Sequence, residues 1–360
     1  MIVNKLLISN GFYPREFFCS TADYIASVQK ESGSIPWYPG GLIDPWDHIE
    51  SAMGLTTAGL YQEAKMAFTW LKDSQEPDGG FWPAYADCSP LDKSRKEAHH
   101  PPYIATGMWH YYLITGDYEF LLEMWPNIEA GIDFACNLQS REGDIYWALL
   151  PDGDKWDDAL VTGCCSILKS LECSILIARA LGEYKSEWII ARERLKKALN
   201  FKPHRFDRYW ESKSRYSMDW FYPVLSGAYS KSQAKKHLDK KWDRFVKPEI
   251  GCKCVSDEPW ITVAESCELI LALLATDHYS MAARLFSWLH WQRDEQGAYW
   301  TGYQTDLGIY WPDEKPTWTS AAVLLAADAL SNTTAASHLF TRDSLSEFDA
   351  SFELSTNAAK

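Results

Sequence analysis

Carboxylates occur beside tryptophans at several points along the chain. Asp44 and Asp47 flank Trp46, and Asp219 precedes Trp220. Flat aromatic rings stack on the apolar faces of sugars, and carboxylates accept hydrogen bonds from hydroxyl groups. Two carboxylates across a pocket can also cleave a glycosidic bond, because one donates a proton while the other activates water. These groups therefore indicate a polar-ligand pocket that could support hydrolysis of a glycoside.

The association of acids with aromatic residues recurs along the rest of the chain. The further groups are Asp152, Asp154, Asp157 and Asp158 around Trp156, Asp257 and Glu258 before Trp260, and Asp313 and Glu314 after Trp311. One loop acid alone is usually just solvated, and Asp44 or Asp158 could instead cap a helix. Taken together, the groups predict one substrate pocket lined by Trp37, Asp44, Trp46, Asp47, Trp82, Trp147, Trp156, Asp219, Trp220, Trp260, Trp300, Trp311 and Trp318.

An internal repeat connects these loops. Each copy runs from a glutamine through a short polar turn and a glycine to a tryptophan, and the clear copies are 29–37, 75–82, 139–147 and 292–300. Glycine is expected where a helix ends in a left-handed turn, so each copy closes a helix. The interval between Gln139 and Gln292 leaves room for two degenerate copies ending near Trp210 and Trp260, which makes six units.

Each unit also holds two segments with the apolar periodicity of a helix. Helices are expected over residues 17–28, 46–58, 61–74, 103–114, 118–138, 158–181, 186–199, 220–229, 233–246, 261–275, 281–291 and 318–330. Connectors as short as 115–117 permit only antiparallel hairpins. Six hairpins in sequence favour an all-α, (α/α)6 barrel as a single domain over residues 1–331, followed by a polar tail over 332–360. Every glycine–tryptophan loop then follows a helix of the same direction, so these loops should share one rim.

Charge and hydropathy argue against several classes of partner. The formal net charge is −14, whereas a duplex-binding protein needs clustered lysine and arginine. The dense basic run at 231–247 is interleaved with acids and aromatics, which is typical of a solvated helix face. No apolar run approaches the roughly 20 residues of a membrane span, and residues 1–18 make a poor signal peptide. We therefore expect neither a nucleic-acid partner nor a membrane span.

Cysteine usage bears on the compartment and on metal chemistry. Five of the nine cysteines lie within apolar helical patterns: Cys136, Cys164, Cys165, Cys173 and Cys267. Buried free thiols are typical of a cytoplasmic protein. Cys252 and Cys254 lack the second pair or the histidine that would complete a zinc site. We therefore expect a cytoplasmic protein without a metal or cofactor, in an oligomeric state that the sequence does not define.

The first-hairpin segment is the most specific stretch. Residues 43–50 open a helix with Pro45-Trp46-Asp47, and the next helix ends in an Asp-Gly turn at 78–79 before an aromatic loop. This region resembles the six-hairpin glycosidases, especially the glucoamylase-like hydrolases, and a Trp-Pro pair before a later amphipathic helix strengthens the resemblance. It covers about residues 30–330 and implies a glycoside or oligosaccharide substrate. It also implies that Asp47 holds hydroxyl groups of the non-reducing sugar.

The resemblance breaks down at the two catalytic carboxylates. Where the glucoamylase-like pattern places its acid, this chain reads Tyr-Trp-Ala at 146–148, and where the pattern places its base it reads Tyr-Trp-Thr at 299–301. If the chemistry has moved to neighbouring loops, we expect Asp157 or Asp158 as the acid and Glu314 as the base.

Two further acids interrupt the otherwise apolar segment 261–274. Glu265 or Glu268 could be a buried functional acid with a raised pKa. Pairing with a histidine or arginine in the core is the alternative.

Other functions are also compatible with the pattern. The Gln–Gly–Trp repeat is similar to that of the prenyltransferase and triterpene-cyclase toroids, in which aromatic faces would stabilise a carbocation. However, the acids at 152–158 lack the Asp-x-Asp-Asp spacing of the cyclases. A non-catalytic sugar-binding toroid is another alternative. An epimerase would need two histidines in the pocket, whereas surface or structural roles are expected for His99, His100 and His110.

Overall fold

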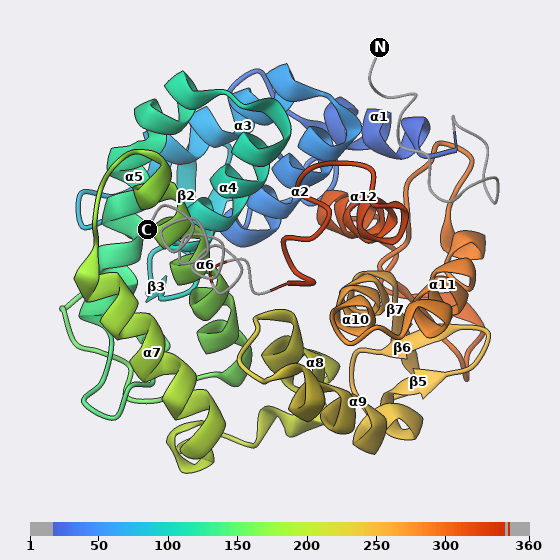
Figure 1. Ribbon diagram of the computed structural model, residues 1–360. Coiled ribbons are helices and arrows are strands. Elements are labelled where there is room, and N and C mark those ends of the chain that lie inside the picture. Colours follow the sequence, from blue (N-terminus) through green and yellow to red (C-terminus); the bar gives the residue numbers. More distant parts are fainter. Residues whose placement is uncertain (1–16, 343–344, 346–360) are drawn as a thin grey trace, which may run out of the picture.

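The computed structural model describes residues 17–342 and 345, and the α-helices in this part of the chain alternate between an inner and an outer layer (Figure 1). The inner helices are α2 (Pro45–Ala58), α4 (Tyr103–Thr115), α6 (Val161–Ala180), α8 (Ser217–Leu225), α10 (Val263–Ala275) and α12 (Thr317–Ser331). Each inner helix packs against the next, and α12 packs against α2, so that the inner layer closes into a ring. The predominantly helical class predicted from the sequence is confirmed.

The outer layer differs from the inner one in polarity. Its helices are α1 (Cys19–Val28), α3 (Tyr61–Ser74), α5 (Tyr118–Asn137), α7 (Ser186–Phe201), α9 (Lys231–Phe245) and α11 (Tyr279–Ser287). α9 buries only Ala234, Leu238 and Phe245 and exposes all its lysines except the half-buried Lys241, as expected for an amphipathic helix on the surface. The basic run predicted to be a solvated helix face therefore lies on this outer helix.

The glutamine–glycine repeat joins neighbouring outer helices. After α1, the side-chain amide of Gln29 donates to Gly33 O at 2.9 Å and to Glu63 O of α3 at 2.9 Å. Gly33 has a φ of +92°, and a Cβ there would lie 2.2 Å from a backbone oxygen of α3, so this approach requires glycine. Gln75 and Gln139 make the same pair of hydrogen bonds after α3 and α5.

The last copy of the repeat closes the outer layer. Gly297 lies against α1, where its carbonyl accepts a hydrogen bond from Thr21 Oγ1 at 2.8 Å. A Cβ on Gly297 would lie 2.5 Å from the backbone of Ser20. The repeat is therefore a structural device that docks one hairpin on another, and it carries no chemistry of its own.

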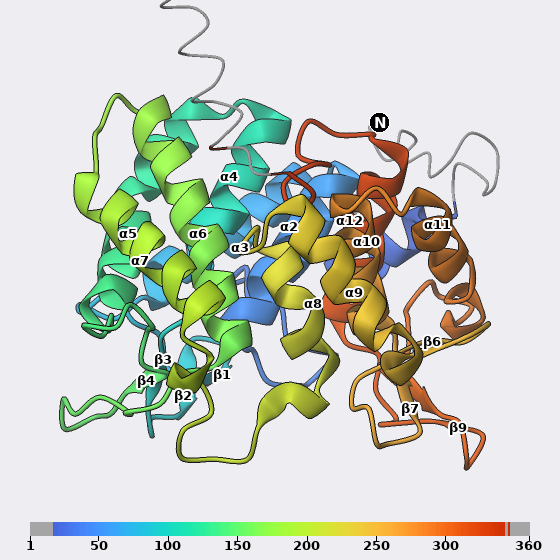
Figure 2. The same cartoon turned by 60° about the horizontal axis from the view of Figure 1, so that its bottom comes forward.

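Short strands lie in the loops that lead into the inner helices, all on one side of the ring (Figure 2). They are β1 (Ala84–Ala86), β2 (Ser89–Asp92), β3 (Lys96–Glu97), β4 (Ala148–Leu149), β5 (Val246–Lys247), β6 (Gly251–Lys253), β7 (Trp260–Thr262), β8 (Gly302–Gln304) and β9 (Ile309–Tyr310). β1 pairs with β2, β3 pairs with β4, and β5 to β9 form an antiparallel sheet in sequence order. Strands of two to four residues are too short to show alternation, so the sequence analysis missed them.

Helix boundaries differ most from the prediction at the inner helices α6 and α8 and at the outer helix α11, which spans 279–287 instead of 281–291. α6 begins at Val161 rather than at residue 158, because Leu160 is still extended. α8 spans residues 217–225 instead of 220–229, and Gly227 at a φ of +73° redirects the chain soon after its end.

The segment after α12 packs on the end of the ring opposite the strands. α12 ends at Ser331, where the predicted domain ends. Leu339 is buried in the core, Phe340 lines the bore of the ring, and Lys169 Nζ donates to Arg342 O at 3.3 Å. The described part of the predicted polar tail is therefore attached to the ring. Its remainder, 346–360, lies outside the described residues, and the division into domain and tail stays a prediction.

Among the described residues, α6 is the helix whose length and composition would allow it to cross a membrane. The sequence analysis overlooked this stretch because Lys169 and Glu172 interrupt its apolar run. In the structure, 83% of it is buried inside the protein, which is typical of a core helix.

Candidate active site

The first turns of the inner helices and the strand-bearing loops form one rim of the ring (Figure 2). Helix N-termini carry unpaired N–H groups and the positive end of the helix dipole, so they favour nearby negative charge. Asp47 lies in the first turn of α2 and Glu265 in the first turn of α10. This rim is therefore suited to holding anionic side chains.

Asp44 fixes the start of α2. Its Oδ1 accepts hydrogen bonds from Trp46 N at 2.8 Å and from Asp47 N at 3.3 Å, and Pro45 occupies the first helical position. Such a cap satisfies N–H groups that the helix itself leaves unpaired. Asp44 is thus the helix cap that the sequence allowed, and it sets where Trp46 and Asp47 begin.

Four carboxylates from two inner helices converge just below the rim. Asp47 and Glu50 are three residues apart on α2, and Glu265 and Glu268 have the same spacing on α10, so each pair shares a helix face. Both helices pack against α12. The charge of Glu265 acts on Asp47 and on Glu50, which shows that the two pairs face a common space. We refer to these four residues as the mouth acids.

Burial and mutual repulsion favour the protonated forms of three mouth acids. Burial, followed by the charges of Asp44 and Glu50, raises the pKa of Asp47 well above its usual range. Burial raises the pKa of Glu50 to about 7. Burial, followed by the charge of Glu50, raises the pKa of Glu268 well above its usual range. A carboxyl group that keeps its proton near neutral pH can act as a general acid.

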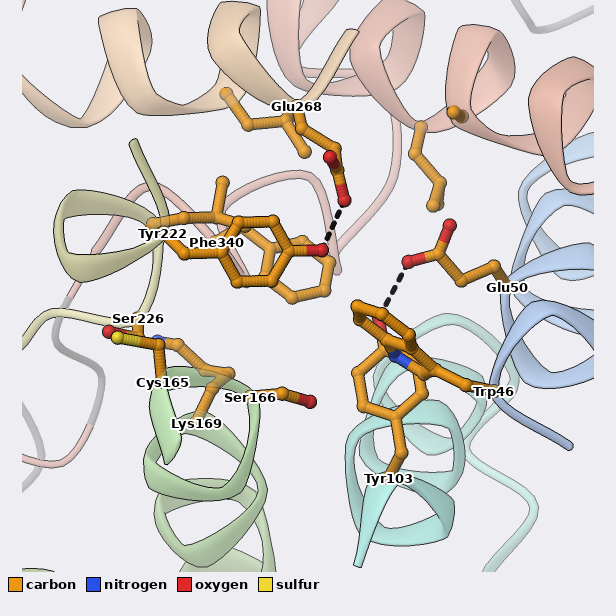
Figure 3. Close-up of a pocket in the computed structure, with 14 residues that line it drawn as sticks. Trp46, Glu50, Tyr103, Cys165, Ser166, Lys169, Tyr222, Ser226, Glu268 and Phe340 are labelled. Carbon is orange, nitrogen blue, oxygen red and sulfur yellow. Dashed lines mark hydrogen bonds between the residues drawn. The ribbon is translucent and has the colours of Figure 1, made fainter. Parts of the chain in front are cut away.

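Two tyrosines support the deeper pair of mouth acids (Figure 3). Tyr103 OH donates to Glu50 Oε1 at 3.0 Å, and Tyr222 OH donates to Glu268 Oε1. The Trp46 ring packs edge-on against both, with centroids 5.3 Å from Tyr103 and 6.0 Å from Tyr222. Glu50 and Glu268 are therefore held in place, whereas Asp47 and Glu265 lie nearer the rim.

Several buried polar groups around the mouth acids lack a partner within the described part of the chain. Glu265 is only 8% exposed, and its Oε2 has no hydrogen-bond partner there. The indole N–H groups of Trp37, Trp46 and Trp318 are also buried and make no hydrogen bond of normal geometry among the described residues, although Trp37 lies beside Asp47 and Trp46 beside Tyr103. Leaving such groups unsatisfied costs about 1–3 kcal/mol each. A ligand rich in hydroxyl groups would satisfy them.

The other rim tryptophans form two clusters at separate places. Trp147, Trp156 and Trp210 pack together with centroid distances of 5.1–6.0 Å in the loops around β4. Trp260 and Trp311 pack at 5.0 Å beside β7 and β9. Figure 2 shows β4 and β9 on opposite sides of the rim. The predicted aromatic set is therefore spread along the rim rather than gathered into one pocket.

Asp157 and Asp158 lie outside the mouth acids. Asp158 is fully buried, and its carboxylate accepts hydrogen bonds from the backbone N–H groups of Ala159, Arg208 and Tyr209 at 2.7–3.0 Å. Asp157 is exposed and pairs with Arg208 at 2.7 Å. Both acids hold one loop against another, apart from the mouth acids, and their expected role as the acid stays a prediction.

Three tryptophans that were expected to contact the substrate have partners within the protein. Trp220 is fully buried and stacks on Phe245, and its indole donates to His237 O at 3.2 Å, so it is a core residue. Trp82 donates to Glu76 Oε1 at 3.0 Å within its own loop. Trp300 stacks on Tyr310 with ring centroids 4.8 Å apart.

Asp219 and Glu314 are the two remaining acids of the predicted site, and neither belongs to the mouth acids. Burial, followed by the charge of Asp207, raises the pKa of Asp219 to about 7. Glu314 precedes α12 on the rim, where Tyr38 OH donates to its Oε1 at 3.4 Å. Its predicted role as the base stays a prediction.

The sequence analysis missed Glu50, Tyr103 and Tyr222. Glu50 lies one turn after Asp47 in a helix that is otherwise mostly buried, and this spacing is the signal that could have identified it. Structural or surface roles were also expected for three histidines. His110 is buried near Thr57, with its Nε2 3.4 Å from the hydroxyl, whereas His99 and His100 lie next to Glu97 on the rim.

Comparison with known proteins supports a carbohydrate substrate. No family model matches the chain. The chain is 44% identical over 320 residues to the MMP endo-(1,4)-3-O-methyl-alpha-D-mannosidase of Mycolicibacterium hassiacum, and the match covers 89% of this chain and 88% of that protein. The isoprenoid alternative finds no support in this comparison.

Solved structures with a similar fold include glycosidases. A GH63 mannosylglycerate hydrolase from Thermus thermophilus, in complex with Tris and D-glycerate, has a TM-score of 0.66 at 13% identity and covers 86% of this chain and 99% of its own. A glycosidase in complex with glucose has a TM-score of 0.67 at 13% identity, with coverages of 91% and 97%. An uncharacterized conserved protein from the same Thermus species has a TM-score of 0.68 at 14% identity, with coverages of 86% and 98%. Likeness at this identity shows the fold alone.

Proposed function

Because the chain belongs to the family of the MMP endo-(1,4)-3-O-methyl-alpha-D-mannosidase and is a glycoside hydrolase, we propose that it cleaves internal (1,4) linkages in chains of 3-O-methylated α-D-mannose. The observation that carries this proposal is the convergence of the mouth acids from α2 and α10 on one space below the rim. Hydrolysis of a glycoside needs an acid and a base in such a space.

Asp47 is the proposed general acid. Its raised pKa favours the protonated form, and it lies nearer the rim than Glu50, which is bonded to Tyr103. In the reaction, Asp47 transfers its proton to the glycosidic oxygen as the bond from that oxygen to the anomeric carbon breaks. The leaving sugar thereby departs as a neutral alcohol.

Glu265 is the proposed base. Its Oε2 is buried and accepts no hydrogen bond of normal geometry among the described residues, and the Cys254 thiol lies beside the carboxyl group, so Oε2 is placed to accept a proton from water. The oxygen of that water forms the new bond to the anomeric carbon, while one of its protons goes to Glu265. Glu314, the base predicted from the sequence, is the alternative, and substitution of each residue separates the two.

The aromatic surroundings fit a methylated sugar. The buried indole N–H groups of Trp37, Trp46 and Trp318 can donate to hydroxyl groups, while the ring faces can cover apolar C–H and O-methyl surface. The clusters around Trp147 and Trp260, on separate parts of the rim, suit further sugars of a longer chain. This arrangement supports binding of an oligosaccharide rather than a single sugar.

The ring is the proposed (α/α)6 barrel of the six-hairpin glycosidases. The closed inner layer, the alternation of inner and outer helices and the glycosidase neighbours support this finer assignment. A cytoplasmic location is also proposed, and the buried free thiols of Cys164, Cys165, Cys173, Cys252 and Cys267 support it.

The direct test is hydrolysis of synthetic (1,4)-linked oligosaccharides of 3-O-methyl-α-D-mannose, with unmethylated mannose oligosaccharides of equal length as the matched control. Internal cleavage of the methylated chains, seen by mass spectrometry as shorter oligosaccharides, is expected. Equal cleavage of both series would contradict the methylated substrate but leave a glycosidase. No cleavage of either series would contradict the proposal as a whole.

A further inference from the structure

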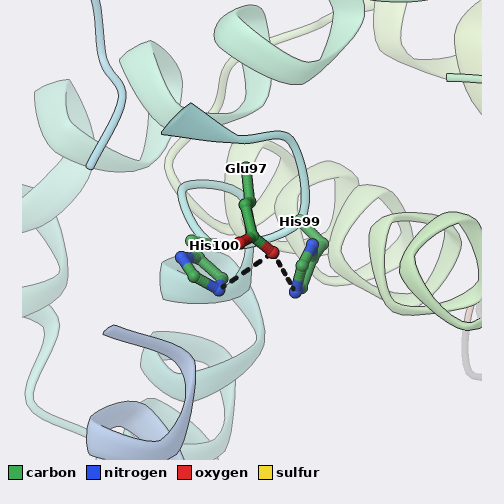
Figure 4. A group of neighbouring side chains, drawn as sticks. All are labelled: Glu97, His99 and His100. Atoms are coloured by element: carbon green, nitrogen blue, oxygen red, sulfur yellow. Dashed lines mark ion pairs between the residues drawn. The ribbon is translucent and has the colours of Figure 1, made fainter. Parts of the chain in front are cut away.

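The segment between β3 and α4 gathers three metal-binding side chains on the rim (Figure 4). Glu97 Oε2 lies 3.8 Å from His99 Nε2 and 3.9 Å from His100 Nε2. Ligand atoms of the three residues all lie within 4.8 Å of one another. His99 is 9% exposed and His100 is 2% exposed, so this group belongs to the protein interior rather than to a solvated surface.

A fourth side chain approaches from a distant part of the sequence. Asp44, the cap of α2, places its Oδ2 3.6 Å from His100 Nε2. The charges of Glu97 and His100 both act on Asp44, so the four side chains share one electrostatic environment. Two segments that are separated by a helical hairpin thus contribute to one cluster.

The distances between the histidine nitrogens and the carboxylate oxygens are longer than those of direct hydrogen bonds and leave room for a shared ion. Hydrogen bonds between these groups would bring nitrogen and oxygen to about 2.9 Å. The three contacts are instead 3.6–3.9 Å. Ligands bound to zinc at about 2.0–2.1 Å in a tetrahedron lie about 3.3 Å apart, so Glu97 and the two histidines would draw together by about half an ångström or more around an ion.

Each carboxylate is also oriented by a second set of contacts. Arg95 holds Glu97 Oε1, with Nε at 2.9 Å, and leaves Oε2 facing the histidines. The backbone of α2 likewise holds Asp44 Oδ1 and leaves Oδ2 facing His100. Metal ligands are typically fixed by such outer contacts, which set their direction before the ion binds.

We propose that Glu97, His99 and His100 bind a divalent transition-metal ion of the zinc class, with Asp44 as an outer contact that orients His100. Imidazole and carboxylate are ligands that zinc and cobalt share. Through the contact of His100 with Asp44, the ion would join the segment before α4 to the start of α2. The His99 ring packs edge-on against Trp46 at 5.4 Å, so the ion would also fix the side chain that precedes Asp47. This inference does not depend on the proposed substrate.

The test measures metal binding directly, on the full chain without an affinity tag and after treatment with EDTA. A Cys88→Ser background removes an exposed thiol that could bind metal by itself. Titration with Co²⁺ is expected to give visible absorption bands that saturate at one ion per chain. Zn²⁺ should displace the Co²⁺ and, at about 100 times its Kd, raise Tm by about 5 °C. A wild-type chain that binds neither ion would overturn the proposal.

Substitutions locate the site. His99→Gln and His100→Gln should each abolish the Co²⁺ bands, and Asp44→Asn should weaken binding about tenfold. The matched control is His204→Gln, since His204 is exposed and remote in sequence from these ligands, and its Co²⁺ spectrum should equal that of the wild type. Circular dichroism confirms that each variant is folded. Co²⁺ bands that persist in both folded histidine variants would overturn the assignment.

Discussion

Two groups of buried acids on the rim side of the molecule have opposite surroundings. Asp144 is fully buried, and Arg205 binds it with Nε at 2.9 Å and with a second nitrogen at 3.1 Å. Burial alone would raise its pKa, but the hydrogen bonds from Arg205 and Ser140 outweigh burial and lower it. The mouth acids instead face one another and two tyrosines, and the pKa values of Asp47 and Glu268 rise.

The comparison separates structural from catalytic acids by their partners rather than by burial. A buried carboxylate paired with arginine stabilises one loop arrangement and has little proton to give. A buried carboxyl group that faces other carboxyl groups keeps its proton, because its charged form would be repelled by them. Burial of such a group lowers the stability of the folded protein, and groups of this kind are typical of active sites. Asp157 and Asp158 also have structural partners, since Arg208 pairs with Asp157 and backbone N–H groups donate to Asp158.

The largest expected effect is loss of activity in Asp47→Asn. The amide keeps the shape of the side chain but cannot protonate the glycosidic oxygen, so kcat/KM should fall about 1,000-fold or more. The measurement is hydrolysis of a 3-O-methylmannose oligosaccharide, with circular dichroism as the check on folding. A folded variant with more than a tenth of the wild-type kcat/KM would remove Asp47 from the role of acid.

Asp144→Ala should lower the stability of the protein but leave its activity nearly unchanged, which is the opposite of the effect expected for Asp47→Asn. Removal of the carboxylate leaves Arg205 unpaired, so the free energy of unfolding should fall by about 3 kcal/mol, while kcat/KM stays within about threefold. Urea denaturation measures the first quantity and substrate hydrolysis the second. If Asp144→Ala lost activity without losing stability, pairing with arginine would not mark a structural acid, and the comparison would be contradicted.

The pH dependence of stability should have opposite signs in the two groups. Glu50 has a folded pKa of about 7, above its usual value of 4.5, so the unfolded chain releases this proton first as pH rises. Its contribution to stability is greatest below pH 4.5 and declines between pH 4.5 and 7. Glu50→Gln should therefore stabilise the protein above pH 7, by about 1–2 kcal/mol. The folded pKa of Asp144 is lowered, so its contribution is lost only as pH falls below about 3.8.

These signs are measured by thermal unfolding of the wild type and of Glu50→Gln from pH 4 to 9. The difference in Tm between the two proteins should grow in favour of the variant up to about pH 7 and then level off. A constant difference across this range would contradict a proton held on Glu50.

The smallest effect is expected for Asp157→Asn. The carboxylate is exposed, and its pair with Arg208 contributes little, as exposed ion pairs usually do. The free energy of unfolding should change by less than about 0.5 kcal/mol, and kcat/KM by less than about twofold. A large loss of activity would restore the acid that the sequence analysis expected and would contradict the comparison.

The helical class and most helix positions could be predicted from the sequence because apolar periodicity and turn glycines are local signals. The pocket could be predicted only in part. Asp47 was expected to bind sugar hydroxyl groups because of the resemblance to the six-hairpin glycosidases, and Glu265 or Glu268 was expected to be a buried functional acid because of the apolar helix around it. The partners of Asp158 could not be identified, because Arg208 lies about 50 residues away and only the folded loops bring the two together.

The measurement that tests the central claim most directly is azide rescue of Glu265→Ala. Azide can occupy the space of the lost carboxylate and attack the anomeric carbon in place of activated water, while Asp47 still protonates the leaving oxygen. If Glu265 is the base, Glu265→Ala should be nearly inactive in buffer and should form a glycosyl azide when azide is added, as detected by mass spectrometry. Absence of the glycosyl azide with folded Glu265→Ala, together with its formation by Glu314→Ala, would contradict the assignment and transfer the role to Glu314.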